Sequence, residues 1–243
     1  MKKTKKLSPA NRIWELDAFR GLCVLGMVIV NFIFDLTQLY GIVRWQAPAA
    51  FLFLQQWGGV LFLLLSGICA TLGSRSIRRG AIVFGCGMLC TLVTAGMYHL
   101  GMAEHYIIIR FGVLHCLGIC MILWALLKRL PTWFLAELGA TVVILGLVFQ
   151  LFLVEAGWLF PLGLVSPGFS SSDYFPLFPH LGFFLLGAVV GRTLYRGKQT
   201  LLPQVDPRTP VLRFLGFCGR QSLPIYLLHQ PVLSLICTIL TLF

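Results

Sequence analysis

Long apolar runs, separated by short polar or basic connections, set the pattern of this chain. A helix needs about 20 predominantly apolar residues to cross the hydrocarbon core of a bilayer. Seven segments meet that requirement: residues 18–37, 49–72, 81–101, 106–127, 132–154, 175–195 and 222–243. The pattern therefore predicts an all-α, polytopic integral membrane protein, with about seven transmembrane helices in one bundle.

Two connections between these segments are long. Residues 155–174 are rich in glycine, serine and proline, and we expect an outer loop that serves as a lid or a substrate entrance. Residues 196–221 end in VLRFLGFCGR, whose mixture of apolar and basic side chains is typical of a segment on the inner membrane surface. Because no internal repeat interrupts the pattern, we expect a single domain over residues 1–243.

Composition supports the membrane interpretation. Hydrophobic residues make up 58% of the chain and charged residues 11%, whereas a soluble domain is about half apolar and about a quarter charged. The formal net charge of +11 might indicate a nucleic-acid partner. The basic residues lie in short clusters between apolar runs, however, which is typical of membrane topology. We therefore expect a lipid bilayer and no nucleic acid as partner.

The basic residues also predict an orientation, because cytoplasmic loops are enriched in lysine and arginine. Of the 19 lysines and arginines, 17 fall on one side of the predicted membrane, and only Arg44 and Arg110 fall on the other. This split places the N-terminus in the cytoplasm and the C-terminus outside. The first apolar segment is too long for a cleaved signal peptide, so we expect an uncleaved first span of a multi-pass plasma-membrane protein.

Seven of the eight cysteines lie inside apolar segments, where cysteine usually acts as a small apolar filler. Two pairs, Cys86/Cys90 and Cys116/Cys120, are spaced to share a helix face. No set of ligands with zinc-type spacing accompanies them, so we expect no metal.

The first span carries the most informative polar residues. At about 100° per residue, Asp17, Arg20, Asn31 and Asp35 fall within a sector of about 60°. This alignment predicts a polar path or cavity along one face of the helix. Alternatively, Asp17 and Arg20 are interfacial anchors and Asn31 makes an interhelical hydrogen bond.

Three later spans carry histidines. His115 lies near the midpoint of the predicted fourth span, and Arg110 lies about one turn into it, where its side chain reaches the outer interface. His180 is expected in the outer half of the sixth span, and His229 shares a face of the seventh with Ser222 and Tyr226. Ionisable residues at the bilayer centre are candidates for function, although a buried histidine is often only a hydrogen-bonding group.

Four motifs occur in a characteristic order: ELDAFRGLCVLGMVIVNFIFDL, LFLLLSG, IRFGVLHCLG and GRQSLPIYLLHQPV. In this order and spacing, they resemble the catalytic domain of heparan-alpha-glucosaminide N-acetyltransferases. The similarity is to the short bacterial branch of that family, within the transmembrane acyltransferases, and it covers nearly the whole chain.

The resemblance implies transfer of an acetyl group from cytosolic acetyl-CoA to an amine or hydroxyl, often of a sugar, at the outer face. The family's asparagine in the outer half of the first span falls on Asn31. Larger members use a histidine in the following loop, but that loop here reads TQLYGIVRWQAP and has none. Since the chain also has fewer spans than those members, we expect either a minimal core or a chain that needs a second copy, as a homodimer.

Acyl transfer needs a base of near-neutral pKa and donors directed at the developing oxyanion. We therefore assign catalysis to His115 as first choice of base, with Asn31 as oxyanion donor and Asp35 beside it. Acceptor binding is assigned to Arg110, His180 and His229, the two histidines being the next candidates for the base. Binding of the acetyl-CoA phosphates is assigned to a cytoplasmic group, namely Asp17, Arg20, Arg78, Arg79 and Arg192.

Two other functions fit the same polar residues. A transporter or flippase would use the polar stripe and the histidines as a relay. A membrane scaffold would use them only for helix association, and would then tolerate apolar replacements of Asn31 and His115.

Overall fold

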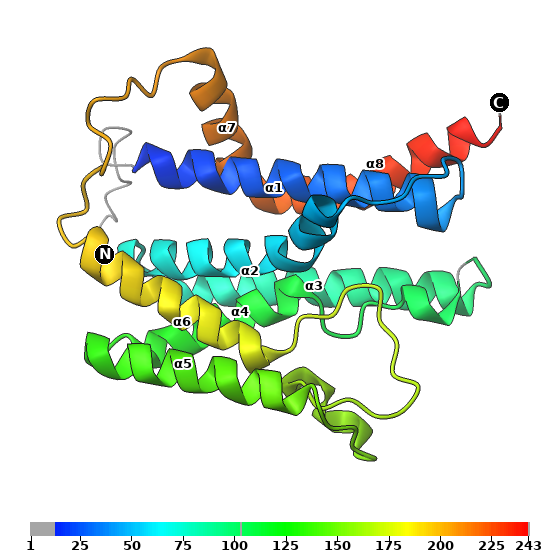
Figure 1. Ribbon diagram of the computed structural model, residues 1–243, viewed down its shortest axis with the longest axis horizontal. Coiled ribbons are helices and arrows are strands. Elements are labelled where there is room, and N and C mark those ends of the chain that lie inside the picture. Colours follow the sequence, from blue (N-terminus) through cyan, green and yellow to red (C-terminus); the bar gives the residue numbers. More distant parts are fainter. Residues whose placement is uncertain (1–12, 103, 243) are drawn as a thin grey trace, which may run out of the picture. The chain divides into compact units, whose positions relative to one another are not determined.

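The computed structural model describes residues 13–102 and 104–242, and in this part of the chain the secondary structure is helical apart from two isolated β-bridges. The basic cluster at residues 2–12 and position 243 lie outside the described residues. The chain forms two compact units (Figure 1). The first comprises the residues up to Gly58 and those from Thr193 onward, and the second spans Gly59–Arg192. The single domain expected over residues 1–243 stays a prediction.

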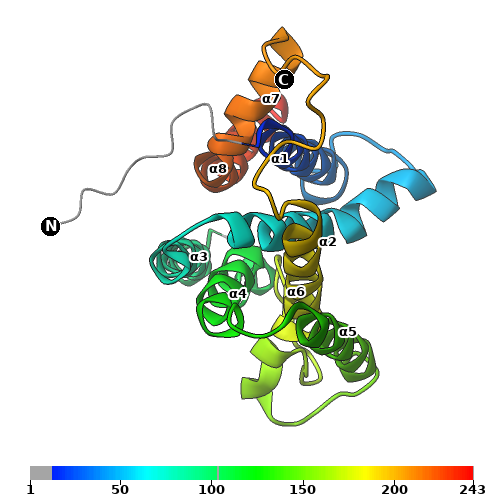
Figure 2. The ribbon, with the colours of Figure 1, turned by 90° about the vertical axis from the view of Figure 1, so that its left-hand side faces the viewer.

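The first unit contains α1 (Trp14–Phe34), α7 (Pro210–Arg220) and α8 (Ser222–Leu240), with the first turns of α2 (Ala49–Leu72). A π-helical turn, Asp35–Leu39, continues α1. The helix α7 lies against the first half of α1, and α8 runs alongside α1 (Figures 1 and 2). A Cβ at Gly21 would collide with the Leu215 carbonyl, and one at Gly219 with the Asp17 carbonyl, so glycine permits this close approach.

The second unit contains the rest of α2 together with α3 (Ser76–His99), α4 (Val113–Leu127), α5 (Thr132–Phe149) and α6 (Leu177–Leu194). Its core includes side chains that are completely buried, namely Leu63, Leu135, Phe184 and Leu185. Gly80 and Gly118 bring α3 and α4 together, and Gly67 and Gly187 do the same for α2 and α6. Small residues at helix contacts are typical of membrane bundles, because they let backbones approach closely.

Six of the described helices are long and apolar enough to cross a membrane: α1 with its π-helical turn, α2, α3, α5, α6 and α8. Many large apolar side chains on these helices are exposed, such as Leu92 at 67% and Val93 at 54%. Side chains of this kind suit a lipid environment. The chain is therefore a multi-pass membrane protein.

Most predicted spans agree with the helices to within a few residues, but the fourth does not. The sequence predicted a span over residues 106–127, whereas α4 begins only at Val113 and has 15 residues. A short 3-10 turn, His105–Ile107, and an extended stretch precede it. The predicted start of this helix at residue 106 was wrong. An apolar run does not distinguish a helix from non-helical backbone whose hydrogen bonds are made by distant side chains.

The fifth span also ends early, at Phe149 rather than at residue 154. Beyond it, the Val154 amide donates to the Val165 carbonyl at 3.0 Å, and Leu153 forms a β-bridge with Val165. A 3-10 turn, Gly157–Leu162, lies between these residues. The outer segment predicted over 155–174 is thus folded onto itself.

Candidate functional site

Polar residues of α1 meet polar residues of α8 within the first unit. The Asn31 side-chain nitrogen lies 3.3 Å from Nε2 of His229. One turn further along α1, the Gln230 amide donates to both Asp35 carboxylate oxygens, at 2.9 and 3.2 Å. Tyr40 follows, and its hydroxyl donates to the Ser234 carbonyl at 3.3 Å. The residue numbers of the bonded partners increase together along the two helices, so α1 and α8 run parallel.

The hydrogen bonds of His229 define its tautomer. Nδ1 lies within hydrogen-bond distance of the Tyr226 carbonyl, which can only accept, so Nδ1 carries the proton. Nε2 therefore presents a lone pair, to which the Asn31 amide donates. Both side chains are half-buried. A neutral imidazole with its basic nitrogen beside an amide donor is an arrangement suited to proton transfer.

Asp35 is only 2% exposed and opens the π-helical turn that follows α1. A carboxyl group in a membrane span is costly unless it has a hydrogen-bonding partner, which Gln230 supplies. Single π-turns inside helices are frequent at functional sites. The sequence singled out Asp35 but not Gln230, although a glutamine next to His229 in an apolar helix was a signal for it.

His115 has both ring nitrogens engaged. It lies at the third position of α4. Nδ1 accepts a hydrogen bond from the Gly112 amide at 3.2 Å. The Thr91 hydroxyl donates to the Ile109 carbonyl at 2.6 Å, so Nε2 of His115 must donate to the Thr91 oxygen at 3.3 Å. The ring is 2% exposed and stacks on Phe111.

Side chains also supply the other hydrogen bonds around the extended stretch that leads into α4. The Ile109 amide donates to Thr94, the Arg110 amide to Ser171 and the Val113 amide to Asp173, at 3.0–3.1 Å. The carbonyl of Phe111 accepts from the Phe175 amide at 2.9 Å. His115 is therefore one member of a polar network that holds this backbone in place.

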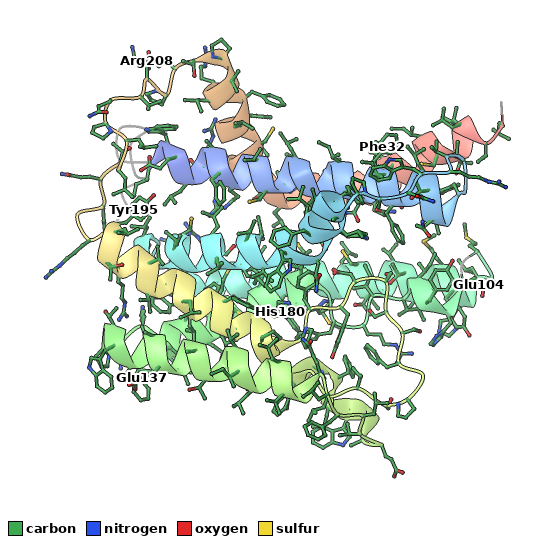
Figure 3. The ribbon with its side chains drawn as sticks, in the orientation of Figure 1. Phe32, Glu104, Glu137, His180, Tyr195 and Arg208 are labelled. Atoms are coloured by element: carbon green, nitrogen blue, oxygen red, sulfur yellow. The ribbon has the colours of Figure 1, made fainter. Side chains whose placement is uncertain are left out.

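The two remaining acceptor-site candidates lie in the second unit. His180, labelled in Figure 3, lies near the start of α6, where its Nδ1 donates to the Pro176 carbonyl at 2.7 Å and its ring packs on Phe175. Arg110 lies before α4 rather than inside a helix, and its Nη2 donates to Nε2 of His105 at 2.9 Å. Sequence reasoning did not identify His105.

The arginines that were predicted to bind the acetyl-CoA phosphates differ in the contacts that they already make within the protein. Arg20 lies 3.9 Å from Asp17 in a loose ion pair within α1. Arg78 and Arg79 are exposed in the first turn of α3. Arg192 donates to the carbonyls of Leu130 and Lys128 and stacks on Trp124, so it already holds the end of α4. Arg20, Arg78 and Arg79 are therefore the cations more available to a phosphate.

Glu15, which the sequence analysis did not select, fixes the long connection before α7. Its carboxylate accepts from the Thr200 hydroxyl and from the Leu201 amide, each at 2.8 Å. This contact ties residues 200–201 to the first turn of α1.

Residues 12–231 match the family described as heparan-alpha-glucosaminide N-acetyltransferase, catalytic. No curated protein and no solved structure matches the chain.

Proposed function

Since the chain belongs to the heparan-alpha-glucosaminide N-acetyltransferase catalytic family, we propose that it moves an acetyl group from cytosolic acetyl-CoA to an amine or hydroxyl at the outer face of the plasma membrane. Membrane acetyl transfer is the general activity of that family, and acetyl-CoA is its donor. The acceptor in this proposal is a sugar or an envelope glycan.

The pairing of Asn31 with His229 is the observation that carries the proposal. The 3.3 Å hydrogen bond is long for a nitrogen donor, so an incoming hydroxyl or amine can replace it at Nε2. Nε2 then takes the acceptor's proton as the acceptor attacks the thioester carbonyl. The Asn31 amide, released from His229, donates to the oxyanion that forms.

Collapse of that intermediate breaks the carbon–sulfur bond and releases CoA as the thiolate. The proton held on His229 passes to the thiolate, so the products are the acetylated acceptor, CoA and a neutral imidazole. His229 replaces His115 as the proposed base, because no lone pair of His115 is free. Asp35 acts as a positioning residue, since it holds Gln230 next to the base.

Helix directions support seven crossings in this proposal. In the second unit, Gly187 meets Leu64 and Gly191 meets Ile68, so α2 and α6 run parallel. Parallel spans require an odd number of crossings between them, and only α3, α4 and α5 lie between. In this proposal α4 crosses as well, which makes α8 the seventh span and agrees with its direction parallel to α1.

A reconstituted assay tests the proposal. Purified protein in nanodiscs is given acetyl-CoA and glucosamine, and acetylated product is measured by mass spectrometry. General-base catalysis contributes about 10²–10⁴-fold, so His229→Ala should lower kcat by at least about a hundredfold. Asn31→Ala should lower kcat by a similar factor, because an oxyanion donor contributes about 10²–10³-fold.

His99→Gln is the matched control, because His99 is an exposed histidine at the end of α3. It should leave turnover unchanged. Loss of turnover in His180→Ala but not in His229→Ala would assign the base to His180. Solute flux through the wild-type protein without any acetyl transfer would contradict the enzyme and favour a transporter.

A further inference from the structure

One face of the helix α7 is apolar and exposed. At about 100° per residue, Val211, Phe214 and Phe217 fall within a sector of about 120° around this helix. Each of these side chains is more than half exposed, so the sector faces outward from the first unit. Exposed apolar side chains that gather on one face mark a surface for a membrane or another apolar partner.

The opposite face of α7 is packed against α1. Gly216 and Gly219 are buried on that face, and Gly219 lies so close to the Asp17 carbonyl that a Cβ would collide with it. Figure 1 shows α7 lying across the first half of α1, whereas α8 runs alongside it. A helix that lies across a membrane-spanning helix extends along the membrane surface rather than through the bilayer.

The contacts of α7 place it at the level where α1 enters the membrane. It meets α1 at Asp17 and Gly21, within about 11 Å of the start of α1 at about 1.5 Å per residue. Glu15 accepts hydrogen bonds from Thr200 and Leu201, so the connection before α7 is held at the same level. Amphipathic helices bury their apolar face about 5–10 Å into the boundary between lipid headgroups and acyl chains. The position of α7 agrees with that boundary.

Arginines border the apolar face of α7. Arg213 and Arg220 are exposed and lie within about 60° of Phe217 around the helix. In the described part of the chain, Asp17 with Arg20 is the ion pair that forms, so Arg213 and Arg220 take no part in one. Their guanidinium groups are therefore available to anions at the edge of the apolar face.

The charge around this end of α1 is positive even when every nearby carboxylate is counted as ionised. Residues 14–21 and 193–221 contain three carboxylates: Glu15, Asp17 and Asp206. The same two segments contain six cations: Arg20, Arg196, Lys198, Arg208, Arg213 and Arg220. An excess of cations beside an exposed apolar helix face is typical of segments that bind anionic lipid surfaces.

We propose that α7 binds anionic phospholipids in the leaflet at which α1 begins. Val211, Phe214 and Phe217 insert between the lipid chains, while Arg213 and Arg220 bind the lipid phosphates. A second copy of the chain does not fit this face, because two copies would bring the same arginines together. Bound lipid anchors the start of α1 through the contact between α7 and α1. This lipid contact does not depend on acetyl transfer.

Photoactivatable lipids test the contact in the full-length protein. Phosphatidylcholine nanodiscs receive a small fraction of a lipid with a diazirine on its acyl chain, either phosphatidylglycerol or phosphatidylcholine. After illumination, lipid attached to residues 210–220 is measured by mass spectrometry. Each arginine near the surface strengthens the attraction of anionic lipid by about fivefold, so the two arginines should favour phosphatidylglycerol by about 25-fold or more.

Substitution of both arginines tests their part in this preference. Arg213→Gln/Arg220→Gln should lower the preference for phosphatidylglycerol by about 25-fold. Arg213→Lys/Arg220→Lys keeps both charges, so the preference should change by less than about threefold. Arg44→Gln, at an exposed arginine elsewhere in the first unit, is the matched control and should keep the preference. An unchanged preference in the glutamine variant would overturn the proposal, as would an equal loss in the lysine variant.

Substitution of the aromatic residues tests the apolar part. Phe214→Ser/Phe217→Ser should reduce labelling of α7 by both lipids, while labelling at Ile29, an exposed residue of α1, should stay the same. Wild-type α7 that neither lipid labels would overturn the proposal. If Phe214→Cys then formed a disulfide between two copies, the face would belong to a second copy of the chain instead.

Discussion

The two ring nitrogens of His115 are both occupied, whereas Nε2 of His229 keeps a lone pair that faces only an amide donor. Sequence position favoured His115, because it was expected near the midpoint of a span, and left His229 as a later candidate. The difference arises from Thr91 and Gly112 around one ring and from Tyr226 and Asn31 around the other. Hydrogen-bond partners, not depth in an apolar run, decide which histidine can take a proton.

His115 should therefore matter more for stability than for chemistry. His115→Ala leaves the buried Gly112 amide without a partner and opens a cavity beside Phe111, at a cost on the order of 3 kcal/mol. We expect a clearly lower Tm by intrinsic fluorescence, with turnover per folded molecule within about threefold of wild type. A normal Tm with a hundredfold loss of turnover would restore His115 as the base.

At the scale of elements, the sequence predicted most helices because length and apolar composition suffice to define a span. It also selected Asn31, Asp35 and His229. It could not show that Asn31 meets His229 or that Asp35 meets Gln230, because those pairs depend on the register between two helices far apart in the chain. The predicted start of the fourth helix was wrong for the same reason. The side chains of Thr94, Ser171 and Asp173, which accept hydrogen bonds from the backbone there, come from other segments.

The glycines at helix contacts allow a prediction about how closely two helices pack. A Cβ at Gly219 would collide with the Asp17 carbonyl, while one at Gly26, also in the first unit, would meet no atom within 4 Å. Gly219→Ala should therefore separate α7 from α1 and destabilise the protein by about 1–3 kcal/mol or more. Gly26→Ala should be neutral or slightly stabilising, because alanine favours helix. Tm measurements on both variants check this, and equal values would contradict the contact.

For the whole molecule, the number of membrane crossings is the property that sequence and helix length determine least well. The helix α4 covers only about 22 Å at about 1.5 Å per residue, less than the roughly 30 Å of a bilayer core. The four non-helical residues 109–112 add at most about 13 Å, at about 3.3 Å each. Non-helical backbone at membrane depth is tolerated where it is buried in protein, and both Phe111 and Gly112 are buried.

Cysteine labelling distinguishes seven crossings from six. With α4 crossing, Arg129 is cytoplasmic and Glu155 is outside; without that crossing, both positions change sides. Both residues are exposed, so cysteines placed there are accessible. In intact cells, a membrane-impermeant maleimide should label Glu155→Cys and should label Arg129→Cys only after permeabilisation. The native cysteines are free but lie within helices and half or more buried, so the unmodified protein gives the background. The reverse pattern would remove α4 from the membrane-spanning set and, with it, the parallel direction of α1 and α8 on which the Asn31–His229 site depends.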